Sequence, residues 1–206
     1  MNAKDFLGIP TGNICDSNGL KGSMDAAIMP MDLHMEMAGI AMTVKCPPED
    51  NLTLHKAIAL AKPGTVLVVD CDGYTGCGIF GELFATSCKA RGIAGIVIDG
   101  ACRDKVDLIE MNFPTFARGV NPNGSRKEVL GAIDEPICCG GVTVNAGDII
   151  IGDADGVVVI AKEKAEEVLK KAQAKKQKES ELKPLLAQGK TTVELLGFAK
   201  KCGMEE

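Results

Sequence analysis

Two short apolar runs separated by a helical segment constrain the fold of this chain more than any other feature. The runs are Gly64 to Asp70 and Ile93 to Asp99, and the second is rich in β-branched residues. Such runs are typical of central strands covered on both faces. Between them, Glu82 to Arg91 has helical composition and is followed by Gly92, a common left-handed helix cap. The pattern predicts a strand, helix, strand unit and an α/β fold.

Capping residues, glycines and prolines mark the other elements. Asp50 and Asn51 supply a cap for a helix over Leu52 to Ala61. Asp104 to Met111 predicts a short helix. The remaining segments predict strands, the last three of them a β-meander: Thr115 to Gly119, Gly141 to Asn145, Asp148 to Gly152 and Gly156 to Ile160.

The 206 residues, 46% of them hydrophobic, are enough to bury the core of one domain with an appended segment. From Glu163 onward the chain is rich in Glu, Lys, Ala and Gln, which predicts a charged helix. Most of its charges are explained by a solvated helix face. A helix of this kind can also pack on a neighbouring subunit.

Charge and hydropathy exclude several classes of protein. We expect a compact cytoplasmic protein without a membrane partner, because no apolar run approaches the roughly 20 residues of a membrane span and the start has no apolar signal core. The net charge of -5 and the 3% aromatic content argue against direct nucleic-acid binding. Nine cysteines without paired C-x-x-C spacing predict buried small residues rather than disulfides or a zinc site, although Arg103 could lower the thiol pKa of Cys102.

A candidate anion site begins at Gly81. In Gly81-Glu82-Leu83-Phe84 a glycine starts a helix, and the first turn of a helix offers free N–H groups to an anion. The second strand is followed by a glycine corner at Gly100 and then by Arg103 and Asp104, a pair suited to holding an anionic substrate and a divalent metal together. The plainer alternatives are a helix cap for Asp104, a surface ion pair for Arg103 and a first-turn acid for Glu82.

Seven segments in one order resemble the RraA-like family, which includes 4-hydroxy-4-methyl-2-oxoglutarate aldolases and regulators of ribonuclease E activity. They are Gly39 to Thr43, Asp50 to Leu52, Pro63 to Asp70, Gly81 to Leu83, Gly95 to Asp104, Pro114 to Gly119 and Gly147 to Val159. The resemblance implies an α/β fold of the swivelling β/β/α type over residues 1–161, followed by a helical tail over 162–206 that packs on a neighbouring subunit. It also implies a homotrimer or homohexamer with active sites between subunits.

The resemblance also implies roles for individual residues. The substrate-binding positions would be Gly81, Glu82, Leu83, Phe84 and Arg103. Main-chain amides of Leu83 and Phe84 would hold the carboxylate of pyruvate, and Asp104 would be the direct ligand of Mg²⁺ or Mn²⁺. Glu82 would order metal-bound water; many aldolases carry aspartate there. Glu179 would be the acid supplied by the adjacent subunit, with Glu181 as a near alternative.

These parts suit metal-dependent cleavage of a 4-hydroxy-2-oxo diacid such as 4-hydroxy-4-methyl-2-oxoglutarate. The cation and Arg103 would stabilise the pyruvate enolate, and oxaloacetate decarboxylation passes through the same enolate. The small 2-oxo acid is therefore the expected partner. A protein-binding regulator of a ribonuclease without enzymatic activity is the alternative of a different class, and an enzyme acting on another 2-oxo acid is a third.

Overall fold

The computed structural model describes residues 1–204. Its helices are α1 (Thr11–Ser17), α2 (Leu52–Leu60), α3 (Glu82–Ala90), α4 (Lys105–Glu110), α5 (Ala165–Ala187) and α6 (Thr192–Leu196), with 3-10 turns η1 (Ala3–Phe6), η2 (Lys162–Lys164) and η3 (Lys200–Cys202). Its strands are β1 (Met29–Pro30), β2 (Met37–Lys45), β3 (Thr65–Asp70), β4 (Gly95–Cys102), β5 (Thr115–Val120), β6 (Ala132–Ile133), β7 (Ile137–Cys139), β8 (Val142–Val144), β9 (Ile149–Asp153) and β10 (Gly156–Ile160).

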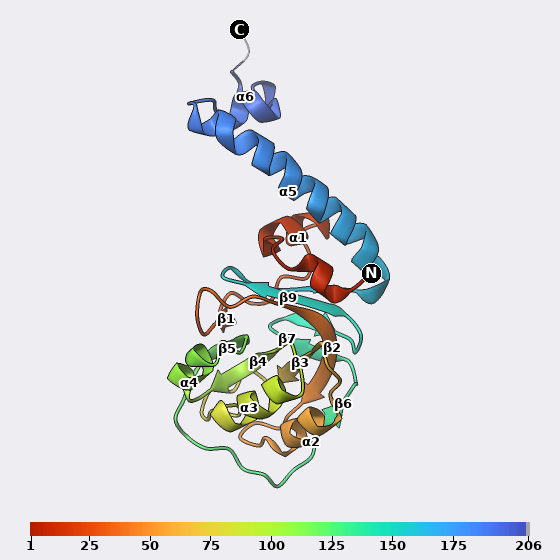
Figure 1. Cartoon of the computed structure of the whole chain (residues 1–206), viewed down its shortest axis with the longest axis vertical. Coiled ribbons are helices and arrows are strands. Elements are labelled where there is room, and N and C mark those ends of the chain that lie inside the picture. The colour runs from red at the N-terminus through yellow and green to blue at the C-terminus, as the bar shows by residue number, and fades with distance from the viewer. Residues whose placement is uncertain (205–206) are drawn as a thin grey trace.

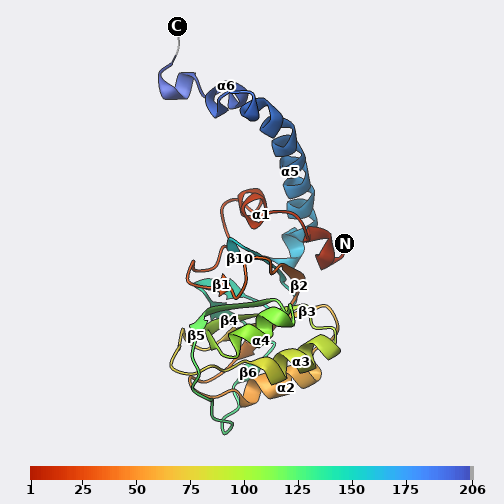
Figure 2. The same cartoon turned by 60° about the vertical axis from the view of Figure 1, so that its left-hand side comes forward.

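One sheet organises the fold, in the order β1-β5-β4-β3-β2-β9-β10 with β6 also paired to β2. Strands β2, β3, β4 and β5 are parallel to one another, and β1, β6, β9 and β10 pair antiparallel with the strands beside them. Figures 1 and 2 show α2, α3 and α4 together on one side of this sheet. The predicted strand, helix, strand unit is β3-α3-β4, and the α/β class is confirmed.

Two details of the prediction are wrong. Strand β4 does not end at the Gly100 corner but continues to Cys102, and its pairing with β5 shifts register between Ile98 and Ala101. The expected three-stranded meander is also absent from the described part of the chain, because β8 pairs with β7 in a separate two-stranded sheet and only β9 and β10 form a hairpin. Alternating apolar residues predict where strands lie in the sequence, but they do not determine which strand pairs with which.

Three apolar clusters fill the interior. The first lies between the sheet and helices α2 to α4 and includes Leu54 and Phe80. The second lies on the other face, where Val68 and Phe116 pack with residues of β7, β8 and β9. The third joins the outer strands to η1, α1 and the first turns of α5. All eight residues of β4 are buried, as expected for a central strand covered on both faces.

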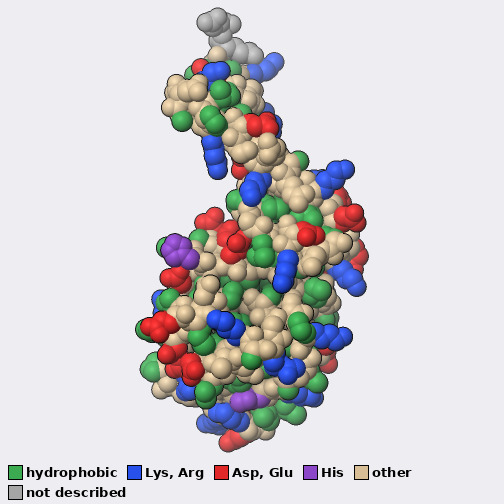
Figure 3. Space-filling view, in the orientation of Figure 1, with side chains coloured by type: hydrophobic (Ala, Val, Ile, Leu, Met, Phe, Trp, Pro, Cys, Tyr) green, Lys and Arg blue, Asp and Glu red, His purple; other side chains and the backbone are tan. Residues whose placement is uncertain are grey.

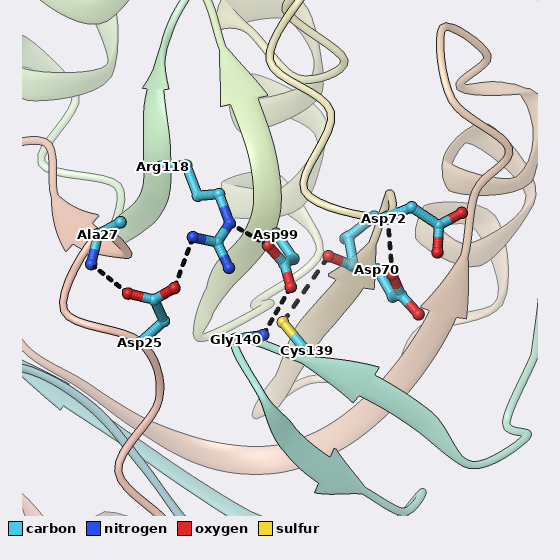
Figure 4. Close-up of polar contacts among 9 residues, drawn as sticks. Asp25, Ala27, Asp70, Asp72, Asp99, Arg118, Cys139 and Gly140 are labelled. Carbon is cyan, nitrogen blue, oxygen red and sulfur yellow. Dashed lines mark hydrogen bonds and ion pairs between the residues drawn. The ribbon is translucent and has the colours of Figure 1, made fainter.

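Charged side chains pair across the ends of four parallel strands. Lys45 of β2 binds Asp70 of β3 at 2.9 Å, while Arg118 of β5 contacts Asp99 of β4 and binds Asp25 at 2.8 Å. The second carboxylate oxygen of Asp99 accepts a hydrogen bond at 2.6 Å from the N–H of Gly140, which lies in the turn between β7 and β8 (Figure 4). This network therefore fastens the segment before β1 and the β7–β8 hairpin to the sheet.

Helix α5 projects from the body and carries α6 at its far end (Figures 1 and 2). Only its first turns are buried, through Ala165, Val168 and Ala172. On the face seen in Figure 3, acidic and basic side chains are interspersed over the helix and the body. None of the helices within residues 1–204 is both long and apolar enough to cross a membrane. Packing of the tail on a second subunit stays a prediction.

Candidate functional site

A cavity of about 520 Å³ lies where α3 begins and β4 ends. Its wall is built from four parts of the chain: the start of α2, the segment leading into α3, the residues after β4, and the loop between β5 and β6. The lining residues include Asn51, His55, Gly81, Leu83, Phe84, Arg103, Asp104, Gly124, Ser125 and Lys127. The structure therefore brings together most of the predicted site, including both members of the Arg103–Asp104 pair.

The start of α3 offers main-chain donors to this cavity. Gly81 occupies the N-cap position and supplies no side-chain cap. The N–H of Glu82 donates to Asp104 Oδ2 at 3.0 Å. The N–H groups of Leu83 and Phe84 have no acceptor in the described part of the chain, since the first turn of a helix lacks internal partners. Two unpaired N–H groups and the positive end of a helix thus face the cavity.

Asp104 connects the two halves of the site. It holds the N-cap position of α4 in a left-handed conformation, with φ 55° and ψ 43°, yet its side chain makes no cap bond to α4. That side chain instead accepts the Glu82 N–H of α3 and lies 3.4 Å from Arg103 Nε. The simple capping alternative is therefore wrong for α4. The backbone of Arg103 is fixed in turn by its N–H, which donates to Phe80 O at 2.8 Å.

Two glycines allow the α3 segment to approach the end of β4 this closely. A Cβ at Gly81 would lie 2.3 Å from Asp104 Oδ2, and one at Gly78 would lie 2.7 Å from Arg103 Cβ. The φ of Gly81 is -161°, so the requirement at that position is space rather than backbone conformation. Local sequence signals identified the glycine-led helix start, and the tertiary contact explains why the residue is glycine.

Two predicted acids lie outside the cavity wall of this chain. The Glu82 side chain accepts a hydrogen bond from Thr86 Oγ1, one turn along α3, at 3.2 Å. Glu179 is on α5, where Asn13 Nδ2 donates to it at 2.8 Å, and Glu181 accepts from Gln177 Nε2 at 2.9 Å. Glu179 therefore contacts α1 of its own chain, and its predicted role in an adjacent subunit's site stays a prediction.

The polar residues of the wall that sequence reasoning did not assign to the site include His55, Asn51 and Lys127. The His55 ring lies 4.5 Å from the Phe84 ring between centroids. Burial, together with the charge of Lys127, lowers the pKa of His55, which favours the neutral imidazole. Asn51 Nδ2 donates to Ile79 O at 2.9 Å, while its buried Oδ1 has no partner within the described residues. The presence of Asn51 in a segment carrying the family resemblance was the available signal.

The donor set around Asp104 suits a hard divalent cation bound with few protein ligands. Asp104 Oδ1 makes no hydrogen bond within residues 1–204, and its side chain is 35% exposed. No cluster of three His, Cys, Asp or Glu side chains arranged for a metal occurs among those same residues. Mg²⁺ commonly keeps several waters and binds one or two carboxylates plus the substrate. A single free carboxylate oxygen beside an anion site fits that pattern.

Most of the cysteines behave as buried apolar residues. Six of the nine are buried, and the structure assigns no disulfide. Burial raises the pKa of the Cys102 thiol to about 11, so the expected lowering by the neighbouring Arg103 is wrong. The thiol of Cys102 points into the core, where desolvation of a thiolate outweighs the exposed cation.

Comparison with known proteins extends this picture of an α/β protein with a candidate anion site beside the Arg103–Asp104 pair. The family described as RraA-like, Aldolase/RraA, matches residues 11–159. A Halalkalibacterium halodurans protein, named provisionally as a 4-hydroxy-4-methyl-2-oxoglutarate aldolase, is 42% identical over 172 residues, covering 82% of this chain and 81% of the relative. The chain therefore belongs to the RraA-like family.

Solved structures agree with this assignment. An uncharacterized protein from Pseudomonas syringae pv. tomato superposes with a TM-score of 0.83 at 28% identity, covering 92% of this chain and 89% of that one. The RNA-processing inhibitor RraA from Thermus thermophilus gives a TM-score of 0.68 at 28% identity, covering 73% of this chain and 92% of its own. The RraA-like fold expected from the sequence is thereby confirmed.

Proposed function

We propose that this protein is a divalent-metal-dependent lyase that releases pyruvate from 4-hydroxy-4-methyl-2-oxoglutarate or a related 4-hydroxy-2-oxo diacid. The observation that carries the proposal is the shared cavity of Arg103, Asp104 and the unpaired N–H groups of Leu83 and Phe84. The name of the 42% identical relative favours the same activity. Oxaloacetate decarboxylase activity is part of the proposal, because both reactions form the pyruvate enolate.

The substrate can be placed by charge. Its C1 carboxylate binds the free N–H groups of Leu83 and Phe84 at the positive end of α3. Its 2-oxo oxygen faces the guanidinium of Arg103, and Asp104 holds Mg²⁺ or Mn²⁺. Lys127, which lines the same cavity, offers a cation to the second carboxylate of a diacid.

The reaction breaks the C3–C4 bond and sends its electron pair toward the C2 oxygen. The bound cation supplies Lewis-acid polarisation of the 2-oxo group. Arg103 donates hydrogen bonds to the oxygen that gains negative charge, which lowers the barrier because these donors are already in place. In the aldol cleavage a base takes the proton of the C4 hydroxyl, C4 becomes the carbonyl of the second product, and C3 receives a proton. In oxaloacetate the departing group is CO₂.

Glu82 and Glu179 complete the proposed site. Glu82 lies at the edge of the cavity, where it can orient a water molecule that moves these protons. Glu179, or its neighbour Glu181, is supplied by the tail of an adjacent subunit in a homotrimer or homohexamer. Helix α5 projects away from its own body (Figure 1). In such an exchange Glu179 would give up its hydrogen bond from Asn13 of α1.

The test is pyruvate release from 4-hydroxy-4-methyl-2-oxoglutarate and from oxaloacetate, with Mg²⁺, with Mn²⁺ and with chelator, against a blank without protein. Arg103→Ala is expected to lose at least 100-fold in kcat/KM, because one oxyanion donor is worth about that much. Arg126→Ala removes an exposed arginine outside the cavity wall and should keep full activity. Equal rates for the Arg103 variant and the unmodified protein would contradict the lyase assignment.

A second candidate function is regulation of a ribonuclease by protein binding. The superposition with the Thermus thermophilus RNA-processing inhibitor supports it, and the net charge of -5 is compatible with a basic partner. We would measure ribonuclease E cleavage of a model RNA with increasing amounts of this protein, together with co-purification of the two. Neither inhibition nor co-purification at micromolar concentration would eliminate this candidate.

A further inference from the structure

The loop between β5 and β6 forms part of the cavity wall. We call residues 121–131 the strap; it is the long green loop of Figure 1. It contributes Gly124, Ser125 and Lys127 to the wall. Gly124 approaches the Arg103 guanidinium closely, since a Cβ built on it would lie 3.8 Å from Nη1. Any displacement of the strap therefore changes the space around Arg103.

Apolar packing does not hold the strap in place. None of its residues is buried, and Val129 and Leu130 are 53% and 55% exposed. Its first half is attached by hydrogen bonds to the segment before α3: the N–H of Gly78 donates to Asn123 O at 2.9 Å, and Ser125 Oγ donates to Gly78 O at 3.1 Å. The second half needs a separate attachment.

That attachment includes the carboxylate of Asp50, which is only 3% exposed. Its Oδ2 accepts the N–H groups of Glu128 and Val129 at 2.7 and 3.0 Å, and its Oδ1 accepts the N–H of Leu52 at the start of α2 at 2.9 Å. Burial alone raises the pKa of Asp50, but these three hydrogen bonds, with Lys127 nearby, lower it below its usual value. The group is thus held as the anion that accepts all three donors.

One carboxylate consequently joins two walls of the cavity. Helix α2 carries His55 on one side, and the strap carries Lys127 on the other. The charge on Asp50 makes these hydrogen bonds stronger than those between neutral groups. Removal of the carboxylate leaves three N–H groups without their acceptor and loosens the strap at Glu128 and Val129. The main-chain hydrogen bonds of Arg126 and the bond from the Gly131 N–H to Thr53 Oγ1 remain.

We propose that Asp50 is a positioning residue that fixes the strap, and with it Lys127 and Gly124, relative to α2 and Arg103. The kinetic part of this inference rests on the proposed function, in which the cavity binds an oxo-diacid. Asp50 touches neither substrate nor metal in this account. Its effect passes through the main chain of Glu128 and Val129.

The experiment compares Asp50→Ala with Asp148→Ala. Asp148 is also buried and accepts two backbone N–H groups, from Asn145 at 2.8 Å and Lys162 at 3.3 Å, but it does not line the cavity. Hydrogen–deuterium exchange of strap peptides is measured without substrate, and the KM for oxaloacetate is measured with Mg²⁺. For Asp50→Ala we expect strap exchange about tenfold faster and a KM raised about tenfold, with a smaller change in kcat.

Two further variants keep the result decisive. Asp50→Asn retains one acceptor oxygen and should fall between the unmodified protein and Asp50→Ala. If Asp50→Ala does not fold, Val129→Pro removes one strap donor while leaving the carboxylate and the start of α2 intact, and it should speed exchange of the same peptides.

Unchanged strap exchange in a folded Asp50 variant would overturn the proposal, as would the same strap effect in Asp148→Ala. Because exchange is measured without substrate, it decides on Asp50 even if the unmodified protein releases no pyruvate. That last result would count against the proposed function alone.

Discussion

Substitution of Gly81 by alanine tests the site where its two halves meet. The new Cβ would lie 2.3 Å from Asp104 Oδ2 and 3.0 Å from Arg103 Cγ. An ordinary contact begins near 3.4 Å, so the Asp104 oxygen must retreat by about 1 Å. Its hydrogen bond from the Glu82 N–H, now 3.0 Å, would then exceed hydrogen-bond length. Both the Asp104 carboxylate, which we propose binds the metal, and the Arg103 guanidinium would lose their positions.

The expected effect is large for activity and small for stability. A misplacement of 1 Å among reacting groups can cost about 100-fold, so kcat/KM should fall by about that factor. The Asp104 side chain is 35% exposed and can rotate toward water, and alanine lowers the entropy of the unfolded chain. The free energy of unfolding should therefore change by no more than about 1 kcal/mol, or roughly 2–4 °C in Tm.

Pyruvate release coupled to NADH oxidation by lactate dehydrogenase measures the activity, and calorimetry measures Tm. Gly12→Ala is the matched control, because a Cβ at Gly12 in α1 meets nothing within 4 Å. The control should keep full activity and gain up to about 1 kcal/mol of stability. A Gly81→Ala protein with unchanged kcat/KM would refute the reasoning, since the clash would then have been absorbed without moving the Arg103–Asp104 pair.

Three further predictions concern separate parts of the molecule. Asp104→Asn should lower pyruvate release at least 100-fold and abolish its response to Mg²⁺, and a variant that still responds to the metal would show that another group binds it. Asp99→Asn should lower the free energy of unfolding by about 2 kcal/mol, because it leaves the half-buried Arg118 guanidinium without one of its charged partners (Figure 4). An unchanged midpoint of urea unfolding would mean that this ion-pair network does not stabilise the fold. Brief iodoacetamide treatment at pH 7 should label the exposed Cys138 and Cys202 but not Cys102, whose thiolate forms only near its pKa of about 11; mass spectrometry of the peptides would reveal early Cys102 labelling if this is wrong.

The sequence by itself determined the central strand, helix, strand unit and pointed to the residues of the candidate site on either side of it. Short, continuous runs rich in β-branched residues are typical of strands covered on both faces, so β3 and β4 could be predicted, as could α3 between them. The glycine-led start of α3 and the Arg103–Asp104 pair were visible as local signals, because main-chain donors and adjacent charges depend on neighbouring residues.

The tertiary structure alone decided which distant groups meet. The pairing of β8 with β7, the close approach of Gly81 to Asp104, and the strap that brings Lys127 to the same cavity as His55 all depend on contacts between segments far apart in the chain. Sequence periodicity records which side of an element is apolar, but not which partner covers it. The thiol pKa of Cys102 was likewise decided by the tertiary structure. Burial, which is a property of the fold, raises it despite the charged residue next to it in the sequence.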